Sequence, residues 1–300
     1  MEGSPVTRVS IPERSYPAGV SSGSSRYTRQ GASEDPCRRD TEGEYIGEWN
    51  STFRVMHING VRLLHDRFPT DRDYPFNLEI FWKTDWIGFS RPVTFFIGEN
   101  GTGKSTLLRA IAKKCNIHIW KDEERYRCNY NRYADELYRY IDVEWAGERV
   151  PGSFFSSELF RYFAEVLDEW AIADPGTLSY FGNDSLMDRS HGQSHMAFFA
   201  SRYQRDGLFL LDEPENALSP ATQIELLHLL REVTSTGDVQ FLIATHSPIL
   251  LAYPDAEIYS FDRIPIRKVG YEETEYYRVC LLYTSPSPRD RTRSRMPSSA

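Results

Sequence analysis

The sequence lacks paired cysteines that could form a metal site or a redox site. Its 300 residues include four cysteines, none in a C-x-x-C pair and none at metal-ligand spacing from a histidine (Cys37, Cys115, Cys128 and Cys280). Isolated cysteines of this kind indicate free thiols in a reducing compartment. The sequence also lacks an apolar run long enough to cross a bilayer and a secretory leader near Met1. We therefore expect a soluble chain of the cytoplasm.

An excess of positive charge is also missing. The formal net charge of −8 disfavours a protein that coats nucleic acid over its whole surface. It does not exclude a local basic patch that binds nucleic acid. Residues 121–140 interleave arginine with tyrosine, a composition that could grip a nucleic-acid strand by charge and stacking. Aspartate and glutamate in the same stretch cancel most of that field, so we favour a solvated polar face. No internal repeat or heptad array occurs, and the length suits one large or two smaller α/β domains.

The most informative stretch that is present reads G-x-x-x-x-G-K-S. It follows an apolar run typical of a buried strand, 93–97, and precedes a stretch typical of a helix, 106–112. Glycines let backbone N–H groups converge on phosphate oxygens, and the following helix directs its positive end at the same anion. In this context the motif predicts a nucleoside triphosphate site. The residues expected to hold the nucleotide are Gly98, Glu99, Asn100, Gly101, Thr102, Gly103, Lys104, Ser105 and Thr106.

Four residues carry expected roles in handling the triphosphate. Lys104 is placed to reach the β- and γ-phosphates, and the Ser105 hydroxyl is placed to ligate Mg²⁺. Further along, an apolar stretch ends in Asp212 and Glu213, which is a Walker B pattern. Asp212 is suited to hold the Mg²⁺ shell, and Glu213 to orient or deprotonate the attacking water. The alternative, an exposed acidic turn after a strand, fits less well with the phosphate-loop motif upstream.

Hydrophobic spacing predicts the elements around these motifs. Aromatic and β-branched residues favour strands over 53–64 and 76–82. Apolar residues at three- and four-residue steps predict an amphipathic helix over 156–171. Ser219 and Pro220 are suited to the cap and first turn of a further helix, predicted over 219–233. A buried strand over 239–244 follows, and ligand groups belong at the carboxyl ends of such strands in an open parallel sheet.

Three further segments resemble motifs of the ABC-ATPase superfamily. Residues 189–194 (R-S-H-G-Q-S) are similar to its L-S-G-G-Q signature, which leads into a helix expected from about His195. Residues 212–219 (D-E-P-E-N-A-L-S) resemble Walker B running into the D-loop. His246, within A-T-H-S-P, resembles the switch histidine. The order and spacing agree over about 53–279, and the likeness is to small soluble ABC/SMC-like ATPases, often labelled AAA family ATPases.

This resemblance implies a fold, a cofactor and an assembly. The fold is that of an α/β P-loop NTPase, an ABC-ATPase-like head with a mostly parallel core sheet, an antiparallel β subdomain and a helical insertion at about 116–185. The cofactors are ATP and Mg²⁺. The assembly is an ATP-dependent homodimer in which two heads, arranged head to tail, bury two nucleotides. ATP would be hydrolysed there, in work coupled to an unknown protein partner.

The resemblance also implies site residues beyond the phosphate loop. Ser190, Gly192 and Gln193 of the signature would meet the γ-phosphate of the second copy in trans. His246 would contact the γ-phosphate in cis and hold Glu213 and the water in place. The expected catalytic groups are therefore Glu213, His246 and Lys104.

The sequence departs from the family pattern in three places. Arg189 and His191 replace a leucine and the first glycine of the signature. No glutamine occurs between Thr106 and Gly192, so the Q-loop residue is missing. Glu158 is the candidate to replace it, although a plain helix-start acid explains it equally well.

The base pocket is less well marked. An aromatic residue that stacks on adenine is expected upstream of the phosphate loop, and Tyr74 or Phe76 could serve. Core packing is the better interpretation for both residues. The choice of adenine over guanine is inherited from the resemblance, since no N-K-x-D guanine reader appears.

We assign residues 51–279 to the ATPase domain and expect both ends to lie outside it. Residues 1–50 are rich in small and charged residues with few large apolar groups, which predicts a disordered tail or a mis-called start. From about Cys280 the sequence resembles the in-frame translation of a transposase library adapter. We therefore expect 280–300 to be a sequencing artefact, with a natural chain that continues differently.

Three functions stay open at this point. The first is an ATPase that couples dimerisation and hydrolysis to a partner, and the second is an ATP-dependent dimerisation switch with little turnover. The third is the ATP-binding subunit of a membrane transporter, against which the missing Q-loop glutamine counts. Too few residues separate Ser105 from Ser190 for the long coiled-coil arms of an SMC machine.

Overall fold

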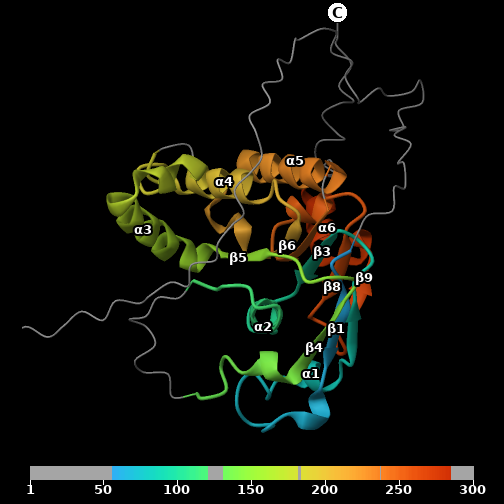
Figure 1. Cartoon of the computed structure of the whole chain (residues 1–300). Helices are drawn as coiled ribbons and strands as arrows, with labels where there is room; N and C mark the ends of the chain where they lie inside the picture. The colour runs from blue at the N-terminus through green and yellow to red at the C-terminus, as the bar shows by residue number, and fades with distance from the viewer. Residues whose placement is uncertain (1–55, 121–130, 182–183, 237, 285–300) are drawn as a thin grey trace, which may run out of the picture. The chain divides into compact units, whose positions relative to one another are not determined.

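A six-stranded sheet carries the elements on which the expected site depends (Figure 1). The computed structural model describes residues 56–120, 131–181, 184–236 and 238–284. In the order β5-β6-β7-β3-β8-β9, five strands run parallel and β9 runs antiparallel to β8. The strands are β3 (Val93–Ile97), β5 (Gly152–Ser156), β6 (Gly207–Asp212), β7 (Val239–Ala244), β8 (Glu257–Ser260) and β9 (Arg267–Val269).

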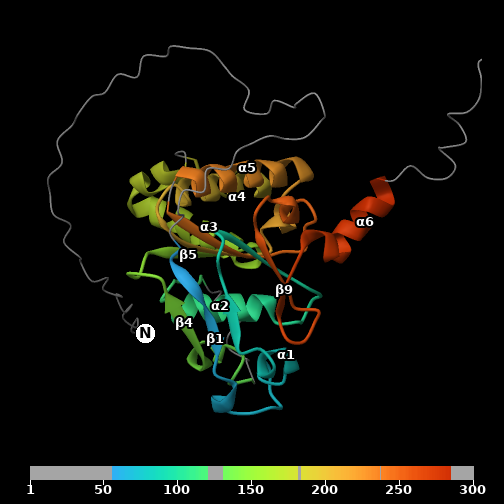
Figure 2. The ribbon, with the colours of Figure 1, turned by 90° about the vertical axis from the view of Figure 1, so that its right-hand side faces the viewer.

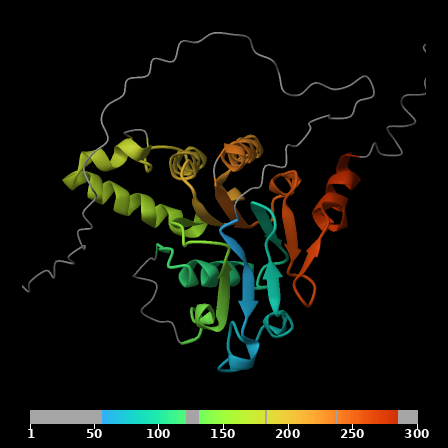
Figure 3. The same ribbon diagram turned by 45° about the vertical axis from the view of Figure 1, so that its right-hand side comes forward.

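Helices cover both faces of this sheet. Figures 1 and 3 show α4 and α5 side by side on one face and α2 on the opposite face. The helices are α1 (Glu79–Trp82), α2 (Lys104–Lys114), α3 (Ser157–Ala173), α4 (His191–Arg202), α5 (Pro220–Thr236) and α6 (Glu275–Thr284). Short 3-10 helices connect them: η1 (His65–Arg67), η3 (Leu137–Tyr140), η4 (Pro175–Phe181), η5 (Pro214–Ala217), η6 (Leu250–Ala252) and η7 (Tyr271–Glu273). None of the helices in the described segments is long and apolar enough to span a membrane.

The central strands β3, β6 and β7 are buried along their whole length. Continuous apolar runs are what strands covered on both faces require. Because successive side chains point to opposite faces, Phe96 and Leu210 join the cluster around α2. Phe95 and Leu211 join the cluster formed with α3, α4 and α5. The sheet is thus anchored by two separate cores, which hold its strand ends in fixed register.

A second sheet of three antiparallel strands packs beside the first, in the order β2-β1-β4. Its strands are β1 (Ile58–Leu63), β2 (Trp86–Gly88) and β4 (Ile141–Trp145). The buried Gln240 of β7 ties the two sheets together. Its Oε1 accepts from the backbone N–H of His57 and Ile58 at 3.0 and 2.9 Å, and its Nε2 donates to the Ile58 carbonyl at 3.1 Å. A mostly parallel core sheet with an antiparallel β subdomain confirms the predicted fold class.

Two of the expected elements are wrong or misplaced. The strand predicted over 76–82 is a turn followed by α1, because Leu78 N–H bonds back to the Pro75 carbonyl at 3.1 Å and the buried Phe76, Ile80 and Phe81 follow helical spacing. The range 116–185, predicted as one helical insertion, also contains strands β4 and β5. Its helical part begins only at α3, which matches the amphipathic helix predicted there.

The arginine- and tyrosine-rich stretch is described from residue 131 onward, and 121–130 lies outside the described residues. Two arginines of its described part contact chain neighbours: Arg132 lies 4.5 Å from the Tyr133 ring centroid, and Arg139 Nε lies 2.7 Å from Glu136 Oε2. Local pairing of this kind is typical of a solvated polar face.

Candidate functional site

The phosphate loop connects the end of β3 to the start of α2. Three of its glycines have positive φ: 144° at Gly98, 83° at Gly101 and 103° at Gly103. Such angles are favourable only for glycine. A Cβ on Gly103 would also lie 2.7 Å from Cζ of Phe81 in α1. The loop can therefore take this path only with glycine at these positions.

Gly103→Ala is expected to lower the free energy of unfolding by about 1–3 kcal/mol, because the residue must keep its positive φ and displace the Phe81 ring. Gly147→Ala is the matched control, since Gly147 has no atom within 4 Å of an added Cβ. Urea denaturation of both variants measures the difference. Equal stability of the two variants would contradict the strained path of the loop.

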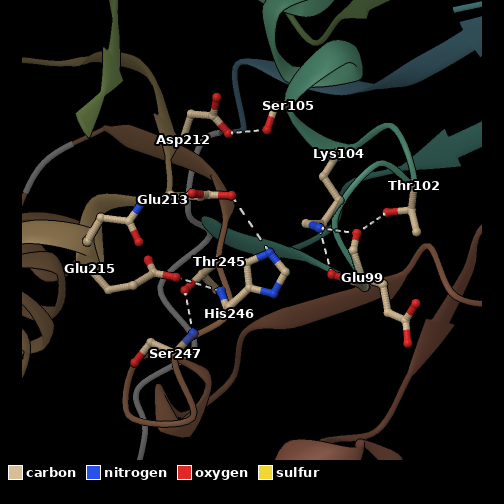
Figure 4. Close-up of polar contacts among 12 residues, drawn as sticks. Glu99, Thr102, Lys104, Ser105, Asp212, Glu213, Glu215, Thr245, His246 and Ser247 are labelled. Carbon is tan, nitrogen blue, oxygen red and sulfur yellow. Dashed lines mark hydrogen bonds and ion pairs between the residues drawn. The ribbon is translucent and has the colours of Figure 1, made fainter. Parts of the chain in front are cut away.

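Lys104 folds back across its own loop (Figure 4). Its Nζ donates to the carbonyls of Gly98 at 2.6 Å and Glu99 at 2.8 Å. Burial lowers the pKa of this ammonium group, while the negative charges of Glu213 and Asp262 oppose that shift. A partly desolvated cation in a glycine-rich loop at a helix start is suited to the oxygens of an anion.

Ser105 and Asp212 contact each other although they come from distant parts of the chain. The Ser105 hydroxyl donates to Asp212 Oδ1 at 2.6 Å (Figure 4). Burial raises the pKa of the Asp212 carboxyl, and the Ser105 hydrogen bond works against that rise. Arg109 lies 3.6 Å from its other oxygen, Oδ2.

The Ser105 hydroxyl oxygen and Asp212 Oδ1 fit Mg²⁺ as ligands. This ion prefers hard oxygen ligands and is often held by one or two protein groups plus phosphates and water. Within the described segments, no group of three or more His, Cys, Asp or Glu side chains could hold a metal ion. A magnesium ion at this point would therefore take its remaining ligands from phosphate oxygens and water.

Glu213 follows β6 directly and has a left-handed backbone, with φ 50° and ψ 55°. Its amide donates to the Ala244 carbonyl at the end of β7 at 2.9 Å. Its carboxylate Oε2 accepts from Asn216 Nδ2 at 2.7 Å, and Oε1 lies 3.7 Å from Nε2 of His246. A non-glycine residue held in this conformation is uncommon and clusters at functional sites. Here it turns the carboxylate toward the phosphate loop rather than along the strand.

His246 faces Glu213 from the end of β7. Its backbone N–H donates to Glu215 Oε1 at 2.6 Å, and its Nδ1 lies 3.2 Å from the Tyr276 hydroxyl. The Nε2 atom is buried and has no hydrogen-bond partner within the described chain. Burial lowers the pKa of His246, and the charge of Lys104 lowers it further. A lowered pKa favours the neutral form of the ring, although Glu213 and Asp262 oppose the shift, and Nε2 is the nitrogen available to a ligand.

The signature segment is placed differently from its prediction. The helix α4 begins at His191 and not at about His195, because Ser190 is its N-cap. Ser190 Oγ accepts from the Gln193 amide at 3.4 Å, and Gln193 Oε1 accepts from the Ser190 amide at 3.2 Å. This reciprocal pair is a capping box, which stabilises a helix start. Gly192 lies against η5, where an added Cβ would be 3.2 Å from the Ala217 carbonyl oxygen.

The two aromatic candidates for the base pocket separate clearly. Phe76 is fully buried and packs in the core, as predicted. Tyr74 is 38% exposed, and its hydroxyl contacts the Thr106 hydroxyl in the first turn of α2. Tyr74 and Thr106 line a cavity of about 200 Å³ together with Arg109 and Lys113. Tyr74 therefore remains available to a base, contrary to its predicted core packing.

Sequence reasoning missed three residues of this site. Glu215 stands only two residues after Glu213, and that spacing was the available signal. Arg109 lies between Asp212 and Glu158, with its Nη2 atom 3.8 Å from Glu158 Oε2. It therefore connects the Q-loop candidate, Glu158, to the expected metal ligand, Asp212. Tyr276 lies in α6, and no motif marks it.

Comparisons with known proteins match the two parts of the chain that carry these residues. A family described as "AAA domain" matches residues 76–112, which include the phosphate loop. A family described as "AAA domain, putative AbiEii toxin, Type IV TA system" matches residues 153–252, which include Asp212, Glu213 and His246. The ferric enterobactin transport ATP-binding protein FepC of Escherichia coli is 32% identical over 158 residues, 47% of this chain and 57% of that protein. The chain is a P-loop ATPase that matches AAA-type domains and is similar to ABC transporter ATP-binding proteins.

Other relatives have similar names. The thiamine import ATP-binding protein ThiQ of a Ruegeria species is 29% identical to the ATPase over 176 residues, 51% of this chain and 69% of that protein. Among solved structures, an ATP-binding cassette of an ABC transporter in its ADP conformation is 17% identical, with a TM-score of 0.43 over 77% of this chain and 96% of its own. The SMC head domain of Thermotoga maritima is 16% identical, with a TM-score of 0.41 over 72% of this chain and all of its own. Both scores are below 0.5, so the assignment depends on the sequence matches and the site geometry.

Proposed function

We propose that the ATPase binds Mg·ATP at residues 98–106 and hydrolyses it to ADP and phosphate in a head-to-tail dimer of two copies. The observation that carries this proposal is the meeting of Lys104, Ser105, Asp212, Glu213 and His246 at neighbouring strand ends. An ATP-rich compartment such as the cytoplasm suits this reaction, and the work that it drives is assigned to an unknown protein partner.

Binding uses the groups of the phosphate loop. Lys104 would exchange its two carbonyl partners for β- and γ-phosphate oxygens, which are stronger acceptors because they are charged. Ser105 and Asp212 would hold Mg²⁺, which neutralises the charge that develops on the phosphates when it is bound. Tyr74 is the side chain best placed for the base, because it is exposed beside Thr106.

Hydrolysis needs a base and a donor on either side of the γ-phosphate. Glu213 would take a proton from a water molecule while the water oxygen attacks the γ-phosphorus. The bond from that phosphorus to the β,γ-bridging oxygen then breaks, which releases phosphate and leaves ADP. His246, a neutral imidazole, would donate from Nε2 to a γ-phosphate oxygen. Proton transfer by a placed side chain typically contributes about 10²- to 10⁴-fold to such a rate.

The signature segment supports the dimer. Within the described residues, no hydrogen bond or ion pair joins 189–194 to the phosphate loop of the same copy. The Gly192 amide belongs to the first turn of α4, whose N–H groups lack intrahelical partners and attract anions. In a head-to-tail pair, Ser190, Gly192 and Gln193 of one copy would complete the nucleotide site of the other.

Mixing two inactive variants tests the dimer directly. Lys104→Ala disables the phosphate loop and Ser190→Arg disables the signature, so each variant alone should hydrolyse ATP at no more than a few per cent of the wild-type rate. A mixed dimer holds one site with both parts intact. Random pairing predicts recovery of up to about a quarter of wild-type phosphate release.

Lys104→Ala mixed with Lys104→Ala,Ser190→Arg is the control, since no mixed dimer of these two has a complete site. Failure of the first mixture to gain activity would overturn the head-to-tail arrangement. A second candidate function, the ATP-binding subunit of a transporter, is favoured by the import and transport names of the relatives. We prefer the first because Glu158, paired with Arg109, stands in the region where transporter subunits carry the Q-loop glutamine.

A further inference from the structure

Tyr276 reaches the site from an element that the proposed chemistry does not use. It lies in α6, which follows η7 at the β9 edge of the main sheet (Figure 2). Its hydroxyl is 3.2 Å from Nδ1 of His246. Both residues line one cavity of about 1110 Å³, which also takes in Glu99 and Asn100 of the phosphate loop. The Tyr276 hydroxyl contacts the His246 ring at Nδ1, whereas Glu213 lies near the other ring nitrogen, Nε2.

Three side chains lie around His246, one at its backbone and one at each ring nitrogen. Glu215 accepts its backbone N–H at 2.6 Å, Tyr276 contacts Nδ1, and Nε2 faces Glu213 Oε1 at 3.7 Å. A neutral imidazole carries its one hydrogen on either Nδ1 or Nε2, and the partner of one nitrogen decides the state of the other. The partner of Nδ1 therefore controls what Nε2 can do.

We propose that Tyr276 is a positioning residue for His246: its hydroxyl donates to Nδ1 and so holds the hydrogen on Nε2, the nitrogen that faces the γ-phosphate. The inference rests on the proposed function, because it needs an anion at that place. A carboxylate and a phosphate both accept hydrogen bonds, so an Nε2 that carries only a lone pair would be repelled by both groups.

Two further observations support the direction of this hydrogen bond. Burial raises the pKa of the Tyr276 phenol, so the group keeps its proton and can donate. The Nε2 atom is buried without a hydrogen-bond partner in the described chain. A buried polar atom of this kind is costly unless a ligand completes it. The γ-phosphate oxygen of bound ATP would be that acceptor.

The tautomer can be measured without any activity assay. We would record the ¹⁵N spectrum of histidine-labelled full-length protein, with the His246→Ala spectrum to assign the signals. In the wild type we expect an Nε2–H tautomer at His246, and in Tyr276→Phe a mixture of both tautomers. Tyr277→Phe, which removes the neighbouring hydroxyl of the same helix, should match the wild type. A wild-type ring with its hydrogen on Nδ1, or no change in Tyr276→Phe, would overturn the proposal.

Single-turnover hydrolysis at saturating ATP gives the second readout. We expect Tyr276→Phe to lower the rate about five- to tenfold with the Kd for ATP changed less than about twofold. In the His246→Ala background the same substitution should have no further effect. An equal loss in that background would show that Tyr276 does not act through His246.

The two proposals fail in different ways. If His246→Ala hydrolyses ATP at the wild-type rate, the role given to His246 in hydrolysis is wrong. The spectra still decide whether Tyr276 sets the tautomer.

Discussion

Glu213→Gln is expected to lower phosphate release by about two to four orders of magnitude while ATP binding is retained. The amide cannot take a proton from water, yet its oxygen can still accept from Asn216, which now bonds to Glu213 Oε2 at 2.7 Å. The local geometry should therefore survive the change. Because hydrolysis no longer ends the bound state, the variant should accumulate as an ATP-bound dimer.

The measurement combines phosphate release with light scattering after size exclusion, both in ATP and Mg²⁺. Glu169→Gln, an exposed carboxylate on α3, is the matched control and should behave as the wild type. Equal phosphate release by wild type and Glu213→Gln would remove Glu213 as the base. Wild-type turnover far below about one per second would instead favour a dimerisation switch.

Lys104→Ala is expected to weaken ATP binding by about two orders of magnitude or more. The Lys104 ammonium now bonds to two carbonyls of its own loop, at 2.6 and 2.8 Å, and would replace both contacts with bonds to phosphate oxygens. Each hydrogen bond to a charged group contributes about 1.5–3 kcal/mol, which supports a loss of this size. Alanine keeps the helix start but removes the charge.

Isothermal titration with a non-hydrolysable ATP analogue measures this loss. The analogue should also raise the melting temperature of the wild type by mass action but leave that of Lys104→Ala nearly unchanged. Lys114→Ala, at the other end of α2 and 3.1 Å from Asp142, serves as the control. Wild-type affinity in Lys104→Ala would place the triphosphate elsewhere.

Much of the fold could be predicted because the patterns are local. Continuous apolar runs predicted β3, β6 and β7 correctly, since strands covered on both faces require them. The strand predicted over 76–82 is wrong because aromatic and β-branched composition favours a strand there, while the buried residues recur at helical and not alternating steps. The start of α4 is earlier than predicted because Ser190, which resembles a signature serine, is also the N-cap of the helix.

The identity and order of the chemical groups follow from the residues alone, because a phosphate loop and a Walker B strand end are local patterns set by glycine φ angles and apolar runs. Which side chains meet depends on the folded chain: Ser105 contacts Asp212, Glu213 lies near His246, and Tyr276 contacts the imidazole at Nδ1. These contacts join residues far apart in the chain. Their distances depend on strand order in the sheet and on the packing of helices against it, and no local spacing contains that information.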